Sequence, residues 1–177
     1  MTFTPNPHSG PVNGDADYQP GEPPDGVPAD FLMDKRAACF VESYLETVEW
    51  SAASDNHGDP YRWHPSALER AWADAREFLN APGVSEAIDA GPNGLPSDCR
   101  HAFHPAYALA GHDFALTRNG HGAGFWDGDW PGEETIRNPG PLYKASKAAG
   151  EVYCLTDTDD DGEPAPGDDG YLTLYLE

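Results

Sequence analysis

The chain has 177 residues and carries 31 acidic against 10 basic side chains, for a formal net charge of −21 at neutral pH. This imbalance argues against direct contact with nucleic acid or an anionic membrane surface, because both need lysine and arginine to neutralise phosphates. The length suits one domain. Because the sequence has no long apolar run and no signal-peptide pattern, we expect a cytoplasmic protein without membrane contact.

The two ends of the chain differ from its middle in composition. Residues 1–29 are rich in proline and glycine and contain acidic residues but no lysine or arginine, and the residues after Lys147 also lack basic side chains. A proline- and glycine-rich segment with few apolar residues cannot bury enough surface to offset the entropy lost on ordering. We therefore expect a flexible acidic arm over 1–29, followed by a single domain over 30–177.

Helical patterns dominate the first part of this domain. Apolar residues recur at helical spacing behind a capping Asp30, and a proline marks the start of the next predicted helix. Pro-Gly and Gly signals supply the ends of these helices. The elements expected here are a helix over 31–51, a loop over 52–64, a helix from 65 or 66 to about 80, and short helices over 84–90 and 105–110.

The segment 111–127, GHDFALTRNGHGAGFWD, is the most informative part of the chain. Its Asn-Gly pair at 119–120 is the preferred dipeptide of a two-residue type I′ turn, in which both central residues have positive φ. Counting outward from this turn places His112 opposite Asp127 at the open end of two strands. The segment therefore predicts a β-hairpin.

The last part of the chain predicts a short helix over 142–149 and two strands over 152–156 and 171–176. The second of these strands alternates between two sets of side chains, as a half-buried strand does. The fold expected is α+β, with two or three N-terminal helices packed on an antiparallel sheet of about four strands. Two hairpins with a short helix between them would supply that sheet.

The predicted hairpin also gathers the residues most suited to chemistry. His112 with Asp113 or Asp127 could hold a metal or act as a base, since a carboxylate can orient an imidazole. Arg118 and His121, at the tip, could grip an anionic ligand. The structural alternative is that His112 and Asp127 form a hydrogen-bonded pair that closes the hairpin. No sequence spacing typical of a zinc or phosphate site accompanies these residues.

An acidic loop near the C-terminus formally fits the spacing of a calcium-binding EF-hand loop. Pro164 stands where an apolar residue belongs, and the flanking segments predict strands rather than helices, which favours an ordinary acidic loop. No cofactor is expected. The residues that would bind calcium are Asp157, Asp159, Asp161 and Asp168.

The two long predicted helices carry acidic residues suited to a binding surface. Those at 42, 46 and 49 recur at helical spacing and form one stripe. Such a surface either keeps a small protein soluble or imitates phosphates and occupies the basic groove of a nucleic-acid-binding protein. The exposed candidates are Glu42, Glu46, Glu49, Glu69, Asp74 and Glu77.

The run GHDFALTRNGHGAGFWDGDW resembles a group of small uncharacterised proteins encoded by bacteriophages and mobile elements of high-GC bacteria. The similarity covers about 108–155, and Ala115 stands where that group usually has a large aromatic residue. The resemblance implies an accessory role of phage type and assigns no catalytic residue.

Two functional hypotheses follow. In the first, the protein is a non-enzymatic accessory protein that binds a host or viral protein with a basic groove, as an acidic DNA mimic of the antirestriction or anti-CRISPR kind. In the alternative, the segment 112–127 carries the site of a small ligand-binding protein or metal-dependent enzyme. Side chains that converge on a pocket would favour the alternative, and an exposed acidic face the first.

Overall fold

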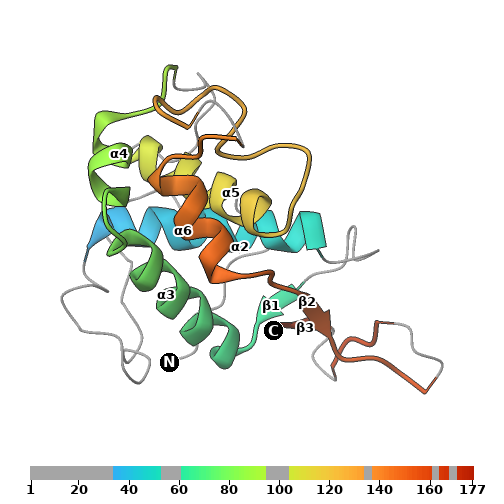
Figure 1. Cartoon of the computed structure of the whole chain (residues 1–177). Helices are drawn as coiled ribbons and strands as arrows, with labels where there is room; N and C mark the ends of the chain where they lie inside the picture. The colour runs from blue at the N-terminus through green and yellow to red at the C-terminus, as the bar shows by residue number, and fades with distance from the viewer. Residues whose placement is uncertain (1–33, 53–60, 95–103, 134–136, 161–163, 168–170) are drawn as a thin grey trace.

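The computed structural model describes residues 34–52, 61–94, 104–133, 137–160, 164–167 and 171–177, so the expected arm over 1–29 lies outside the described residues. Figure 1 shows helix α5 near the centre, and it packs most extensively on α2 and next on α6. The elements are α2 (Lys35–Ala52), β1 (Tyr61–Trp63), α3 (Pro65–Leu79), α4 (Val84–Ala90), α5 (Pro105–Arg118), α6 (Pro141–Ala149), β2 (Cys154–Thr156) and β3 (Leu172–Leu176).

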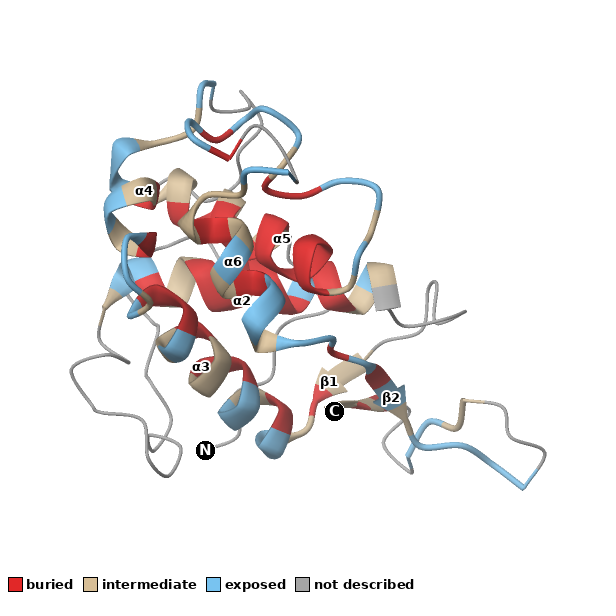
Figure 2. Cartoon of the chain, viewed as in Figure 1, coloured by how far each residue is buried: buried red, intermediate tan, exposed pale blue. Residues whose placement is uncertain are grey.

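Helix α5 is the core of the molecule. Nearly every residue from Tyr107 to Arg118 is buried, and Figure 2 shows this helix mostly in red. Its Phe114 packs against Phe40 of α2 and Phe78 of α3, with ring centroids 5.4 Å and 4.6 Å away. A helix that is buried all round has no polar face and therefore no amphipathic period in its sequence.

The predicted hairpin over 111–127 is wrong, because its first half is the end of α5. Asn119 has φ −86°, in the helical region, and Gly120 alone has the positive φ of 69°. The His121 N–H donates to the Leu116 carbonyl at 3.0 Å, and the Gly120 N–H donates to that of Thr117 at 3.2 Å. These two bonds form a Schellman motif, so the Asn-Gly pair ends a helix instead of turning a hairpin.

The sheet also differs from the prediction. The three described strands form one mixed sheet in the order β1-β3-β2, with β1 parallel and β2 antiparallel to β3. The expected antiparallel sheet of about four strands is therefore wrong, and only its second hairpin, β2–β3, is present. Strand β1 lies inside the segment 52–64, which we expected to be a loop, and its three residues are too few to show a strand period.

Most of the predicted helices are confirmed. Helices α3, α4 and α6 start and end within two residues of the expected positions, whereas the short helix expected over 105–110 continues to Arg118. Helix α2 starts at Lys35, and its cap is Asp34 rather than Asp30. The Asp34 carboxylate accepts the backbone N–H of Arg36 at 2.8 Å, which satisfies one of the free donors at the helix start.

Candidate functional site

The residues predicted to share a hairpin site do not converge. His112, Asp113 and Arg118 are on α5, His121 follows its end, and Asp127 is in the loop beyond. The carboxylate of Asp127 accepts the Gly124 N–H at 3.0 Å and so braces its own loop. The expected pairing of His112 with Asp127 across two strands is therefore wrong, because it depended on the hairpin.

Arg118 and Asp113 have structural partners in the interior. The Arg118 guanidinium has no exposed surface and donates from Nη1 to Asp74 Oδ2 and to the Tyr44 hydroxyl, both at 2.6 Å. Asp113 accepts the indole N–H of Trp130 at 2.7 Å, and burial raises the pKa of its carboxyl to about 7. Neither side chain is placed to grip a ligand from solvent.

His112 instead lines an open hollow on another part of the surface, called here the Trp50 hollow. Its volume is about 430 Å³, and helix α2 supplies most of its wall, with one residue each from β1 and α5. The lining residues are Ser43, Glu46, Thr47, Glu49, Trp50, Tyr61 and His112.

Hydrogen bonding fixes the tautomer of His112. The Thr47 Oγ1 lies 2.7 Å from the Ser43 carbonyl oxygen, a separation between two oxygens that places the hydroxyl proton between them. The same Oγ1 lies 3.0 Å from His112 Nδ1, and with its proton already donated it acts there as acceptor. Nδ1 therefore carries the hydrogen, and Nε2 is the basic nitrogen with the lone pair.

The surroundings of His112 favour the neutral form of its imidazole. Burial lowers its pKa below the ordinary value of 6.5, since desolvation disfavours the charged form. The ring of Trp50 stacks on it with centroids 6.0 Å apart and an interplanar angle of 30°. A neutral imidazole held by a hydroxyl on one side and an indole on its face has a defined orientation toward the hollow.

Two carboxylates and two aromatic rings complete the hollow. Trp50 is 51 % exposed, one of few large apolar side chains so exposed among the described residues. Burial, together with the charges of Glu49 and Glu46, raises the pKa of Tyr61 to about 12. The carboxylates therefore act on the same space as the aromatic rings, and carboxylates beside π faces are the chemistry that recognises organic cations.

The position of this hollow at the end of α2 adds to its negative potential. The last turn of α2 contains no basic residue, although the C-terminal end of a helix carries the negative pole of its dipole. Glu46 and Glu49 lie in the last two turns, where carboxylates are unfavourable for the helix itself.

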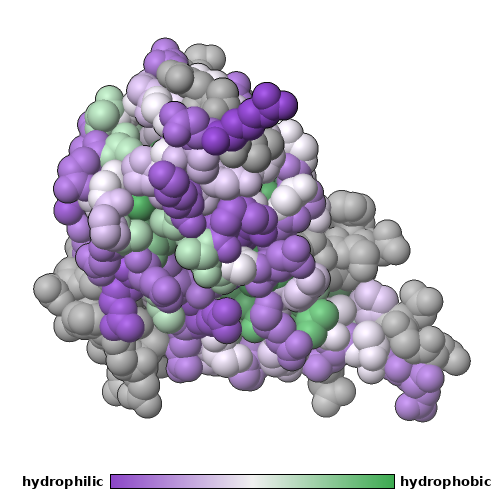
Figure 3. All heavy atoms as spheres, viewed as in Figure 1, coloured by the Kyte–Doolittle hydropathy of each residue, from purple (hydrophilic) through white to green (hydrophobic). Residues whose placement is uncertain are grey.

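The six acidic residues proposed as a binding surface have different surroundings. Glu46, Glu69 and Glu77 are exposed, whereas Glu42 and Glu49 are half-buried. Asp74 is only 11 % exposed and belongs to the interior ion pair with Arg118, so it does not serve an external surface. The face drawn in Figure 3 is covered mainly by hydrophilic residues, in keeping with the composition of the chain.

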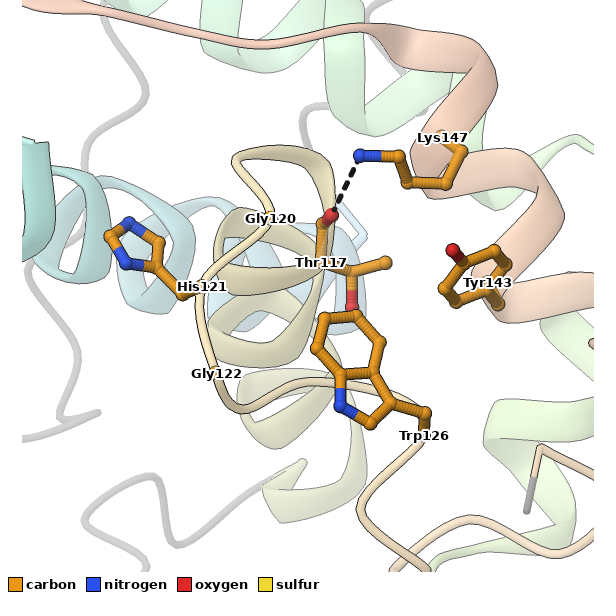
Figure 4. A pocket seen from close by; sticks show the side chains of 7 residues that line it. All are labelled: Thr117, Gly120, His121, Gly122, Trp126, Tyr143 and Lys147. Atoms are coloured by element: carbon orange, nitrogen blue, oxygen red, sulfur yellow. Dashed lines mark hydrogen bonds between the residues drawn. The ribbon is translucent and has the colours of Figure 1, made fainter. Parts of the chain in front are cut away.

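A second hollow, of about 370 Å³, lies where α5 ends beside α6 (Figure 4). Lys147 reaches over it and donates to the carbonyls of Thr117 and Arg118 at 3.4 Å and 3.1 Å, which caps the end of α5. His121 points away from the gap between Lys147, Trp126 and Tyr143 in this view. The lining residues are Thr117, Gly120, His121, Gly122, Trp126, Tyr143 and Lys147.

The predicted calcium loop gains no support. Asp157 accepts the Tyr175 hydroxyl at 3.3 Å and Asp159 is exposed, while Asp161 and Asp168 lie outside the described residues. Within the described parts of the chain, no three acidic, histidine or cysteine side chains are grouped so that they could hold a metal ion.

Several lining residues of the Trp50 hollow were missed at the level of sequence. Thr47 and Ser43 occur inside a helix pattern and carry no motif, and Tyr61 lies in a strand that was expected to be a loop. A usable signal existed for Trp50, a large apolar residue on the polar face of an amphipathic helix. Its pairing with His112 required knowledge that α5 packs across α2.

No family model, curated protein or solved structure is similar to the chain at a level that indicates a relationship. Among the described helices, none combines the length and apolar character needed to cross a membrane.

Proposed function

We propose that the protein is a non-enzymatic binding protein that captures a basic segment of another protein at the Trp50 hollow. The observation that carries the proposal is the exposed indole of Trp50 in one hollow with the carboxylates of Glu46 and Glu49. A lysine or arginine side chain fits both features at once, through charge and through cation–π contact.

The character of the hollow supports binding over chemistry. It is open to solvent, and the hydroxyl beside the imidazole, that of Thr47, gives its proton to the Ser43 carbonyl rather than to the ring. Within the described residues no carboxylate is hydrogen-bonded to that imidazole. A base needs a substrate held against it and a water-excluding wall. The expected enzyme site over 112–127 is not assembled, which removes the constellation on which the alternative rested.

The test is binding of a fluorescent hexalysine or hexaarginine peptide, measured by anisotropy at pH 7.5. The variant Glu46→Gln/Glu49→Gln removes two charges from the hollow, and Glu69→Gln/Glu77→Gln removes two from exposed positions of α3. We expect the first pair to raise Kd about tenfold or more and the second by about twofold, since only the first removes local contacts.

Trp50→Ala separates site binding from general attraction to an acidic protein, because it leaves the net charge unchanged. We expect it to weaken peptide binding by about three- to tenfold, in line with a partly desolvated cation–π contact. Equal effects of the two charge pairs, with no effect of Trp50→Ala, would show diffuse electrostatic attraction and overturn the proposal.

In its finer form the partner is a nucleic-acid-binding enzyme, and the protein is an inhibitor of phage type that occupies the basic groove of that enzyme. The net charge of −21 and the carboxylates of α2 support this class of partner. A pull-down from a high-GC bacterial host should then yield such an enzyme, released by added salt and displaced by DNA. An enzyme retained by Glu46→Gln/Glu49→Gln would contradict this form.

A further inference from the structure

We infer that Nε2 of His112 is a third acceptor for the captured cation, so that uptake of a lysine or arginine side chain at the Trp50 hollow is controlled by protonation of this one imidazole. This inference rests on the proposed function and adds to it the hydrogen-bond geometry and the regulation of the site.

The first step is the hydrogen-bond chain behind His112. The hydroxyl of Thr47 donates to the Ser43 carbonyl at 2.7 Å and accepts from Nδ1 at 3.0 Å, so the chain ends on the backbone of α2. This polarity leaves the imidazole with its lone pair on Nε2. Within the described residues no side chain or backbone group donates to that nitrogen.

The second step is the chemistry of the guest. An ammonium group has three N–H donors and a guanidinium has five, and neither has an acceptor. The side chains of Glu46, Glu49 and His112 line the same hollow, and Trp50 adds a π face stacked on the imidazole. Because Nδ1 is engaged by Thr47, Nε2 is the ring nitrogen left to accept from a guest. These acceptors can therefore hydrogen-bond a cationic N–H donor, whereas the two carboxylates would repel an anion.

The third step is what a proton does to this set. Protonation at Nε2 replaces the acceptor with a donor and adds a positive charge, so the cation loses a hydrogen bond and gains a repulsion. The hydrogen bond from Nδ1 to Thr47 remains in both forms, so the orientation of the ring does not change. Only Nε2 changes, from a group that attracts a cation to one that repels it.

The charged and titratable groups around His112 come from three elements. Helix α2 contributes Glu46 and Glu49, and β1 contributes Tyr61, whose pKa is raised to about 12 by burial. On α5 itself the neighbouring Asp113 is directed to Trp130 inside the protein. Burial lowers the pKa of His112, so the switch operates on the acid side of neutrality.

The experiment measures Kd for the hexalysine and hexaarginine peptides from pH 7.5 to pH 5.0. For the native protein we expect Kd to rise about tenfold or more across this range, as the loss of one charge-assisted hydrogen bond predicts. For His112→Gln, which has a neutral amide at this position, we expect a change of about twofold. The carboxylates are the same in both proteins, so their own titration cancels.

Nitrogen NMR of the histidine ring gives a readout that does not depend on binding. We expect His112 with its hydrogen on Nδ1 at pH 7.5, and loss of this tautomer preference in Thr47→Val. A hydrogen found on Nε2 overturns the inference, as does an equal pH dependence in the native protein and His112→Gln. Those results leave the proposed function intact, whereas failure of the native protein to bind either peptide at pH 7.5 removes the proposed function itself.

Discussion

The guanidinium of Arg118, at the end of α5, donates to the carboxylate of Asp74 on α3 at 2.6 Å, with no part of the arginine side chain exposed. Its remaining donors reach the carbonyls of Ala149 and Gly150 at 3.0 Å and 2.7 Å, which are acceptors left over at the end of α6. The hydroxyl of Tyr44 joins the pair from α2. One residue thus connects four helices in the interior.

Because Arg118 connects four helices, we expect Arg118→Met to lower the stability of the fold strongly. The variant removes the buried guanidinium from Asp74, which keeps only Tyr44 and the exposed Arg70 as donors, and it leaves two backbone carbonyls without their donor. The free energy of unfolding should therefore fall by about 3–5 kcal/mol. Urea unfolding followed by far-UV circular dichroism measures the change. Arg70→Met is the control, because Arg70 bonds the same carboxylate from a side chain that is 47 % exposed. We expect a loss of about 1 kcal/mol or less there, and equal losses would show that burial does not matter.

The sequence predicted the amphipathic helices well and the buried helix badly. Helices α3 and α6 present one apolar stripe each, and prolines at their starts add a local signal. Helix α5 is buried over most of its surface, so its residues show no helical period. Its glycine at 111 indicated the end of a short helix, and its threonine at 117 is typical of strands. The Asn-Gly pair at 119–120 then favoured a hairpin, because the same dipeptide occurs both in type I′ turns and at the C-terminal ends of helices.

The candidate site was predictable in parts. His112 was selected for its chemistry, and Glu46 and Glu49 for their spacing along α2. Their convergence was not predictable, because it depends on which face of α5 packs on α2 and where β1 enters the sheet. Pairing across elements distant in sequence is tertiary information, and composition and periodicity do not contain it.

The close packing of α5 on α2 predicts that Gly111→Ala is destabilising. A Cβ at Gly111 would overlap the carbonyl oxygen of Phe40, so the two helices must separate. The free energy of unfolding should fall by about 1–3 kcal/mol, as overpacking of a core does. Gly122→Ala is the matched control, since nothing lies within 4 Å of its Cβ position, and its effect should stay within about 0.5 kcal/mol. Chemical denaturation distinguishes the two, and a tolerated Gly111→Ala would contradict the close approach.

The side chain of Glu133 caps the start of helix α6, although Glu133 lies several residues before that helix in the sequence. Its carboxylate is 1 % exposed and accepts the backbone N–H groups of Leu142 at 2.8 Å and Tyr143 at 3.1 Å, the first turn of α6. Glu133→Ala should lower the free energy of unfolding by about 1–2 kcal/mol, because two helix donors lose their partner. Exposed Glu77→Ala is the control and should change little. Hydrogen exchange of the Leu142 and Tyr143 amides should accelerate, and unchanged protection of both would argue against the cap.

The buried carboxyl of Asp113 predicts how stability depends on pH. Burial, with smaller contributions from the charges of Asp129 and Asp127 and against the hydrogen bond from Trp130, raises its pKa from 3.8 to about 7. Between these values the folded protein holds a proton that the unfolded chain has released. The contribution of this group to stability is therefore full below about pH 4 and is lost as pH rises to 7.

Asp113→Asn should remove that dependence. The amide stays neutral at every pH, and its oxygen can still accept the indole N–H of Trp130. Measured by urea unfolding at pH 5.0 and pH 8.0, the stability of the variant relative to the native protein should rise with pH by about 1–3 kcal/mol. Exposed Glu77→Gln, at a position whose charge is not among those that shift the pKa of Asp113, should follow the native protein at both values. A difference between Asp113→Asn and the native protein that stays constant from pH 5.0 to pH 8.0 would show that the Asp113 carboxyl ionises in the folded state as readily as in the unfolded chain.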